Sequence, residues 1–207
     1  NCNLCVRACR EVQVNDVIGM ANRGADSKVV FDFDDPMGDS TCVNCGECVQ
    51  ACPTGALMPS TVTSEDGKGD SADYDRKIDS VCQYCGVGCQ LTYHVKDERI
   101  VYVDGRDGPA NQNRLCVKGR FGSDYIHHGD RITKPLIRLE GARKGIHDDF
   151  DPAKPLTHFR EASWEEALDF AAKGLTDIRD TQGKKALAGF GSAKGSNEEA
   201  YLFQKLV

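Results

Sequence analysis

The chain contains 207 residues, of which 40% are hydrophobic and 28% are charged, and its formal net charge is −6. This composition is ordinary for a globular protein and long enough for one large domain or several small ones. The acidic balance argues against a nucleic-acid partner, which needs a concentrated positive patch. Its apolar stretches fall far short of the ~20 residues of a membrane-spanning helix.

Eleven cysteines are the most informative residues of the chain. They fall into three groups, at 2–9, 42–52 and 82–116, and none lies between 117 and 207. A secreted disulfide scaffold is one explanation for so many cysteines. The repeated short spacings instead favour thiolates that bind metal, which fits a reducing compartment such as the cytoplasm.

The first two groups form an internal repeat. The first group has the spacing C-x2-C-x3-C, at Cys2, Cys5 and Cys9. The second has the spacing C-x2-C-x2-C-x3-C-P, at Cys42, Cys45, Cys48 and Cys52. The match predicts that the first group continues upstream, with another cysteine two positions before Asn1.

The second spacing is typical of two-cluster ferredoxins, in which the fourth cysteine ligates the other [4Fe-4S] cluster. The repeat therefore predicts a crossed arrangement. Cluster 1 would use the upstream cysteine together with Cys2, Cys5 and Cys52. Cluster 2 would use Cys9, Cys42, Cys45 and Cys48. Zinc is the alternative for such knuckles, but a four-ligand zinc site would leave extra thiols.

Two short strands, over 17–24 and 28–33, are predicted between these groups, and 34–40 read as a loop. Residues 60–80 are polar, acidic and rich in Ser, Asp and Gly, so we interpret 61–78 as a linker between modules.

The third group has the spacing C-x2-C-x3-C-x26-C, at Cys82, Cys85, Cys89 and Cys116. All four lie in one stretch, so the site is self-contained. A zinc ribbon remains an alternative. With the upstream cysteine the total of eleven becomes twelve, or three sets of four, which favours three [4Fe-4S] clusters.

Alternating apolar residues around the third group predict a β-hairpin, with strands over 90–96 and 99–104 and a turn near Asp97–Glu98. The stretch from 129 to 162 is expected to form strands and loops.

The clearest helix signal lies over 163–180. Ser163 and Glu166 have the spacing of a capping box. One face carries apolar residues at three- and four-residue intervals, so we expect this face to pack on a core. These residues are Trp164, Leu168, Ala171, Leu175 and Ile178.

The last segment reads as a strand over 185–190, a glycine-rich loop and a helix over 197–207, with a second capping box at Ser196 and Glu199. This is the pattern of a βα unit that begins an α/β domain. Because one strand and one helix cannot cover a parallel sheet, we expect the polypeptide to continue beyond Val207.

The residues from Ser80 to Gly122, with "CQYCGVGC" and "CVKGRFG", resemble the cluster domain of molybdenum- and tungsten-dependent formate dehydrogenases of the bis-pyranopterin guanine dinucleotide family. The motifs "ITKPLIR", "SWEEAL" and "GFGSAKGSNEEAYLFQKLV" continue this resemblance. The first two cysteine groups look like the double-cluster ferredoxin module that precedes it. The resemblance covers nearly the whole chain and is nearest to the alpha subunits of NAD-dependent members.

The resemblance implies an α+β fold with four parts. A ferredoxin-like double [4Fe-4S] domain would cover 1–60, followed by the linker at 61–78. A small β-rich [4Fe-4S] domain would cover 79–135. The start of a molybdopterin-binding α/β domain would cover 136–207.

The resemblance also implies roles for individual residues. The cluster held by Cys82, Cys85, Cys89 and Cys116 would be nearest to the metal. Lys118 matches the family lysine between that cluster and a pterin, where it would relay electrons. Gly191, Ser192 and Lys194 could contact the dinucleotide through a helix N-terminus, although a plain βα turn is an equal explanation. The family's metal-ligating cysteine or selenocysteine and its histidine would lie beyond Val207.

The implied reaction is formate oxidation to carbon dioxide at a molybdenum or tungsten pterin. The resemblance implies that the electrons pass through three [4Fe-4S] clusters to partner subunits that carry flavin and NAD. We expect a cytoplasmic protein. Two alternatives stay open: the large iron–sulfur subunit of an NADH:quinone oxidoreductase, and a polyferredoxin or zinc module without a reaction.

Overall fold

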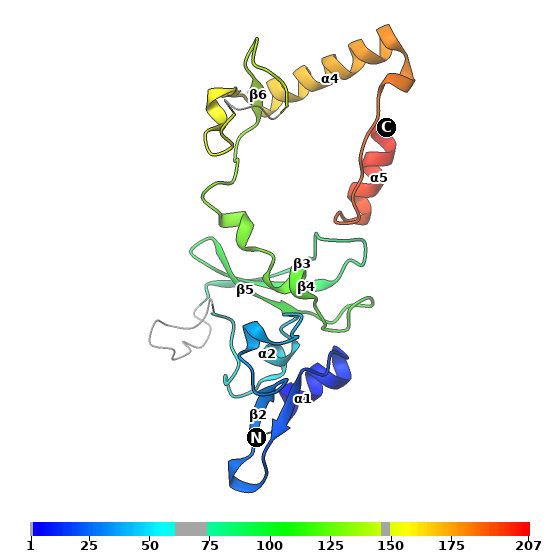
Figure 1. Ribbon diagram of the computed structural model, residues 1–207. Helices are drawn as coiled ribbons and strands as arrows, with labels where there is room; N and C mark the ends of the chain where they lie inside the picture. The colour runs from blue at the N-terminus through cyan, green and yellow to red at the C-terminus, as the bar shows by residue number, and fades with distance from the viewer. Residues whose placement is uncertain (1, 61–73, 146–149) are drawn as a thin grey trace. The chain divides into compact units, whose positions relative to one another are not determined.

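The computed structural model describes residues 2–60, 74–145 and 150–207. The chain divides into two compact units (Figure 1). The first unit runs to His127 and also includes Ser192–Tyr201. The second unit contains His128–Gly191 and Leu202–Val207.

The first unit begins with two joined helical turns, α1 (Leu4–Arg7) and the π-helix η1 (Ala8–Val12). Strand β1 (Ile18–Ala21) then pairs antiparallel with β2 (Lys28–Phe31) through the 3₁₀ turn η2 (Gly24–Asp26), which confirms the two predicted strands. A further 3₁₀ turn, η3 (Met37–Asp39), leads to helix α2 (Glu47–Ala51). Their shared core consists of Val6, Cys9, Val17, Ile18 and Cys48.

A three-stranded antiparallel sheet follows in the same unit. Its order is β3 (Arg76–Val81), β4 (Gln90–Lys96) and β5 (Arg99–Gly105). The predicted hairpin is confirmed, and Asp97 and Glu98 have φ angles of 49° and 60°, as in a type I′ turn. Strand β3 corrects the linker boundary, because residues 76–78 pair with β4. The linker residues 61–73 lie outside the described part of the chain.

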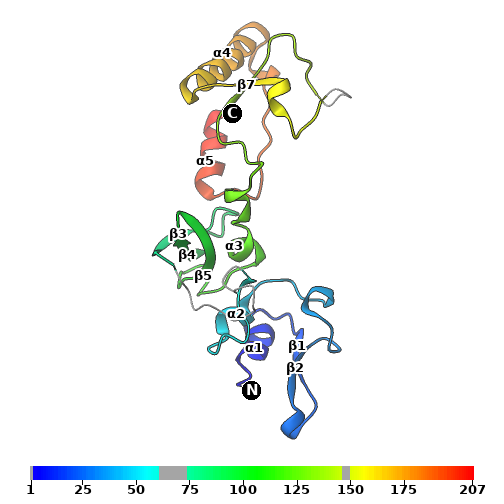
Figure 2. The same ribbon diagram turned by 90° about the vertical axis from the view of Figure 1, so that its left-hand side faces the viewer.

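Helix α3 (Val117–Phe121) packs against β5, as Figure 2 shows, and the 3₁₀ turn η5 (Asp124–His127) follows. The core under this sheet consists of Cys82, Leu91, Val103 and Leu115. Cysteines thus belong to the core of both halves of the first unit.

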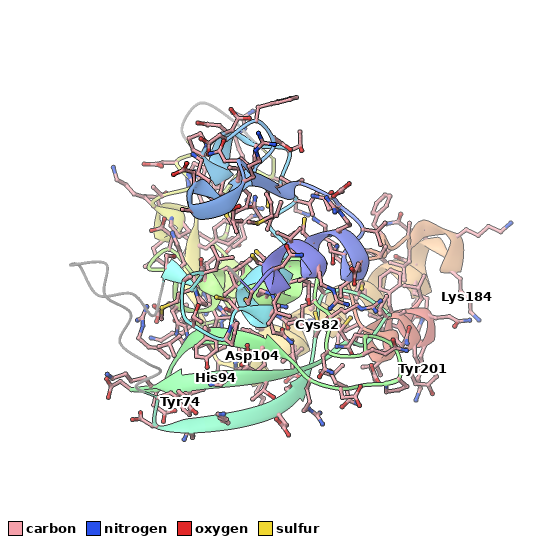
Figure 3. All side chains as sticks on the ribbon, turned by 90° about the horizontal axis from the view of Figure 1, so that it is seen from below. Tyr74, Cys82, His94, Asp104, Lys184 and Tyr201 are labelled. Carbon is pink, nitrogen blue, oxygen red and sulfur yellow. The ribbon has the colours of Figure 1, made fainter. Side chains whose placement is uncertain are left out.

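The sheet also carries a buried histidine. His94 on β4 is 2% exposed, its Nε2 lies 3.0 Å from Oδ2 of Asp104, and its ring stacks on Tyr102 at 3.8 Å (Figure 3). Tyr74 meets the same ring edge-on. This cluster anchors the first described residues after the linker to the sheet.

The second unit contains a short antiparallel pair and the long helix. Strand β6 (Leu136–Arg138) pairs with β7 (Phe159–Glu161), which follows the 3₁₀ turn η6 (Pro155–Thr157). Helix α4 (Trp164–Gln182) begins where predicted, and Oγ of Ser163 accepts a hydrogen bond from the Glu166 amide at 3.1 Å. The Glu166 side chain does not complete the box, because it pairs with Arg160.

The expected packing of α4 is not observed. No residue of α4 is buried, and Trp164 and Leu168 are 69% and 62% exposed. The apolar stripe is present, but the described residues of this unit place no core against it.

The last segment is partly as predicted. Helix α5 (Asn197–Leu206) has a complete capping box: the Glu199 amide donates to Oγ of Ser196 at 3.2 Å, and the Ser196 amide donates to Oε2 of Glu199 at 2.6 Å. The predicted strand over 185–190 is wrong. A 3₁₀ turn, η7 (Lys184–Ala186), replaces its start, and within the described part of the chain no strand pairs with it. A strand needs such a neighbour for its backbone groups.

Among the described residues, no helix combines the length and apolar character needed to cross a membrane.

Candidate iron-sulfur sites

The second cysteine set, which comprises Cys9, Cys42, Cys45 and Cys48, lines one cavity of about 60 Å³. Cys9 comes from η1, whereas the other three come from the loop before α2 and from α2 itself. Apolar side chains, including Ile18, Met37 and Phe121, complete the lining. The structure therefore brings Cys9 to the set from the second sequence motif.

Two of these thiols, Cys45 and Cys48, are desolvated by burial. Burial is the main cause that raises the pKa of the Cys48 thiol to about 12, and the neighbouring charges of Cys45, Cys42 and Cys9 contribute to the same shift. Burial also raises the pKa of Cys45. Such thiols stay protonated at neutral pH unless a bound cation replaces the proton, as metal binding does. The donor set and its dry surroundings fit an iron–sulfur cluster.

Backbone amides point at sulfur atoms of this set. The Val17 amide donates to Sγ of Cys9 at 3.4 Å, and the Asn44 amide donates to Sγ of Cys42 at 3.4 Å. Hydrogen bonds of this kind stabilise thiolate charge and help to set a cluster's potential.

The third cysteine set comprises Cys82, Cys85, Cys89 and Cys116. Cys82 follows β3, Cys85 and Cys89 lie in the loop to β4, and Cys116 is the N-cap of α3. The Cys82 amide donates to the Cys89 carbonyl at 2.8 Å and so closes the loop. Burial raises the pKa of Cys89, and the charges of Cys82, Cys85 and Cys116 raise it further, so all four lie within electrostatic reach.

Asn111 shapes the loop that returns Cys116 to the other three. Its side chain is buried and its Nδ2 donates to the carbonyls of Gln90, Arg106 and Arg114 at 2.9, 3.1 and 3.0 Å. Its Oδ1 accepts from the Gln90 amide at 3.0 Å. Sequence reasoning missed this residue, and the only available signal was an asparagine in the polar stretch before Cys116.

The first cysteine set comprises Cys2, Cys5 and Cys52 within this chain. Cys2 is exposed, and Cys5 packs against the core that contains Cys9 and Cys48. Helix α1, which contains Cys5, packs on α2, which ends just before Cys52. No three or more Cys, His, Asp or Glu side chains within the described ranges form a group that could hold a single metal ion.

Cys52 differs from the buried thiols. Burial is the largest single influence on the pKa of the Cys52 thiol, and it raises that pKa. Hydrogen bonds act in the opposite direction and together lower the pKa to about 7; they come from the Leu57 amide, the Thr54 hydroxyl and the amides of Thr54 and Ala56. The loop after Cys52 is therefore a set of donors directed at one sulfur, which suits a thiolate ligand.

The other predicted site residues are exposed. Lys118 lies on α3, just after Cys116, and its side chain faces solvent. Ser192 and Lys194 form an exposed turn in which the Lys194 amide donates to Oγ of Ser192 at 3.1 Å. Asn197, at the start of α5, donates to the Gly86 carbonyl at 3.0 Å, which joins this end of the first unit to the third-set loop. Gly191, also exposed, belongs to the second unit.

Three family models match consecutive parts of the chain. Residues 1–56 match the 4Fe-4S dicluster domain, and 75–128 match the molybdopterin oxidoreductase Fe4S4 domain. Residues 131–207 match the molybdopterin oxidoreductase model. Three consecutive parts of the chain are thus similar to the Fe4S4 and molybdopterin segments of molybdopterin oxidoreductases, in the expected order.

The chain is also similar to curated proteins whose names describe oxidoreductases. The chain is 35% identical over 241 residues to "Probable oxidoreductase YjgC" of Bacillus subtilis (strain 168). It is 32% identical over 243 residues to "Putative formate dehydrogenase SA2102" of Staphylococcus aureus (strain N315). Both matches cover 100% of this chain but only 23% of the relative, so the chain spans less than a quarter of the length of these proteins.

Proposed function

We propose that this chain is the electron-transfer segment of a formate dehydrogenase. The observation that carries the proposal is the presence of the second and third cysteine sets in one compact unit, in which neighbours of Cys116 are hydrogen-bonded to Glu47 and to the Cys45 carbonyl. The name of the Staphylococcus aureus relative supports formate as the substrate. The whole enzyme would include the rest of the molybdopterin domain.

In this proposal each of the three cysteine sets holds one [4Fe-4S] cluster. Such clusters, when bound, accept and release single electrons. Formate oxidation yields carbon dioxide, one proton and two electrons, and a molybdenum or tungsten bis-pyranopterin guanine dinucleotide would supply that chemistry when bound. The third set would hold the cluster at which electrons enter, and the second and first sets would hold the clusters that pass them onward.

Lys118 is proposed to lie between the third set and the pterin. The Lys118 side chain is exposed, so its ammonium group can contact a ligand that another part of the whole enzyme holds. A lysine there can donate hydrogen bonds to a pterin ring and stabilise negative charge. Gly191, Ser192 and Lys194 are proposed to contact the dinucleotide, which the hydrogen bond between Asn197 and the third-set loop supports.

NAD reduction through flavin- and iron–sulfur-carrying partner subunits and a cytoplasmic location complete the proposal. Both rest on the resemblance of the motifs to NAD-dependent formate dehydrogenases. The acidic net charge of −6 is compatible with protein partners and gives no reason to invoke nucleic acid.

The test is performed on the complete holoenzyme, purified without oxygen. Metal, sulfide and pterin analysis is combined with formate-dependent reduction of an artificial electron acceptor. The proposal expects iron, acid-labile sulfide, a pterin with molybdenum or tungsten, and reduction that requires formate. Iron–sulfur clusters without pterin or formate activity would instead indicate an electron carrier, such as a subunit of an NADH:quinone oxidoreductase. Zinc without sulfide would reject both.

A further inference from the structure

A buried ion pair joins the second cysteine set to the third. Arg120 and Glu47 are only 5% and 6% exposed, and Nη2 of Arg120 lies 2.7 Å from Oε1 of Glu47. Glu47 begins α2, between Cys45 and Cys48, whereas Arg120 lies on α3, four residues after Cys116. Figure 2 labels both helices. The pair therefore connects two cysteine motifs that are far apart in the sequence.

Arg120 is hydrogen-bonded to a cysteine of each set. Its Nε donates to the Cys45 carbonyl at 2.7 Å, and its backbone amide donates to the Cys116 carbonyl at 3.2 Å. A third contact runs from Nη1 to the Val103 carbonyl at 3.5 Å. One residue thus links the backbone of a second-set cysteine to the backbone of a third-set cysteine.

Glu47 adds a second connection. Its Oε1 also accepts a hydrogen bond from the Leu115 amide at 2.9 Å, directly before Cys116. Further along α2, Gln50 accepts from the Gly105 amide at 3.1 Å and donates to the Asn113 carbonyl at 3.0 Å. Helix α2 is therefore held against the loop that carries Cys116 by several directed polar contacts.

The packing around Arg120 is tight. Gly46 has a φ of +73°, and a Cβ there would lie 2.2 Å from Cδ of Arg120 and 2.9 Å from Cζ of Phe121. Only a glycine fits both this backbone conformation and this close approach. The guanidinium is consequently fixed directly over the turn between Cys45 and Cys48.

A buried ion pair is a weak way to gain stability, because removing both charges from water costs nearly what their attraction returns. Apolar side chains could hold two domains together equally well. What directed hydrogen bonds add is one defined separation and orientation of the two backbones. Electron transfer between two bound clusters depends steeply on their separation and on the bonds that connect them. The ion pair between Arg120 and Glu47 can therefore do more than hold the two cysteine motifs together, because it also fixes the separation of their clusters.

We propose that Arg120 is a positioning residue that sets the rate at which an electron passes from the cluster of the third cysteine set to that of the second. In this step the third-set cluster loses one electron and the second-set cluster gains it, with no proton transfer and no further reactant. The identity of the electron donor rests on the proposed function, whereas the positioning of the two clusters does not.

The test compares Arg120→Met, Arg120→Lys and Glu47→Gln in the complete holoenzyme. Arg114→Met is the matched control, because it removes an exposed guanidinium from the loop that leads into α3. Two measurements are made besides iron content. Electron paramagnetic resonance of dithionite-reduced protein reports the magnetic interaction between the two clusters. Rapid freeze-quenching after formate addition reports the order and rate of their reduction.

We expect Arg120→Met to keep its iron, lose much of the magnetic interaction and slow reduction of the second-set cluster at least tenfold relative to the third-set cluster. Arg120→Lys, which keeps the charge but not the fork of donors, should be intermediate. Glu47→Gln should show a smaller slowing, and Arg114→Met none. If Arg120→Met loses iron, the rates of second-set cluster reduction in Arg120→Lys and Glu47→Gln decide whether Arg120 positions the two clusters.

Wild-type interaction and rate in the iron-complete Arg120 variants would overturn the inference. Loss of iron from Arg120→Lys as well as Arg120→Met would also overturn it, because Arg120 would then be needed for cluster assembly. If formate reduces no centre in the wild-type protein, the proposed function fails instead. The dithionite-reduced spectra would still decide the role of Arg120.

Discussion

Cys9 and Cys48 line the same cavity, although Cys9 belongs to the first cysteine motif and Cys48 to the second. The charge of Cys9 contributes to the raised pKa of Cys48, so the two sulfurs are also close in electrostatic terms. This relationship is the geometry that crossed ligation requires.

Substitution of the two last cysteines of the repeat should therefore have crossed effects. We expect Cys9→Ala to lose the cluster of the second set and Cys52→Ala to lose the cluster of the first, since each removes one of four ligands. The measurement is iron content together with the resonance signal of each cluster. Loss of the sequence-local cluster in each variant would reject crossed ligation.

Lys118→Ala should slow electron entry without loss of iron. The side chain is exposed and no thiol depends on it in the described part of the chain, so cluster assembly should be unaffected. Because the lost donor would face the pterin, we expect formate-driven reduction of the third-set cluster to fall by tenfold or more, while dithionite still reduces it fully. Lys205→Ala, another exposed lysine, is the control. A loss of iron in Lys118→Ala would assign it a structural role.

Asn111→Ala should destabilise the loop that carries Cys116. It leaves three backbone carbonyls and the Gln90 amide without this partner, and each buried unsatisfied group costs about 1–3 kcal/mol. We expect a lower unfolding temperature and faster loss of the third-set cluster on exposure to chelator. Arg114→Ala changes only an exposed side chain of the same loop and should leave both unchanged. Equal behaviour of the two variants would show that Asn111 does not hold the loop.

The pH dependence of alkylation should separate two classes of thiol in cluster-free protein. Only the thiolate reacts, so Cys52, with a pKa of about 7, should reach half its maximal rate near neutral pH. Cys48, with a pKa of about 12, should remain protonated and slow throughout that range. Mass spectrometry after alkylation from pH 6 to 9 assigns each site. Equal rates at pH 7 would contradict the donor arrangement after Cys52.

The lowered pKa of Cys52 also affects the stability of the folded protein. The folded pKa of Cys52 lies below its ordinary value of 9.0, so the thiolate contributes stability to cluster-free protein above pH 9. That contribution falls as the pH drops towards 7.

Local patterns in the sequence predicted the elements that need only their own residues. The hairpin around Asp97–Glu98 and the capping box at Ser196 and Glu199 both form as expected. The strand over 185–190 did not form, because a strand depends on a neighbour that its own residues cannot provide. Likewise, the apolar face of α4 is present but its packing is not.

The contacts between the cysteine sets could not be predicted in the same way. Arg120 and Glu47 are 73 positions apart, and each looks like an ordinary surface charge in the sequence. The available signal was that both lie within cysteine motifs, where a bound cluster would exclude water. A charge enclosed in such a place needs a partner, but only the folded chain shows which one.

The most direct test of electron relay through these cysteine sets is quantitative electron paramagnetic resonance of the complete holoenzyme, frozen after anaerobic addition of formate. The account predicts signals from three reduced [4Fe-4S] clusters, with the third-set cluster reduced first and the second-set cluster magnetically coupled to it. A holoenzyme whose clusters are reduced by dithionite but not by formate would contradict the account.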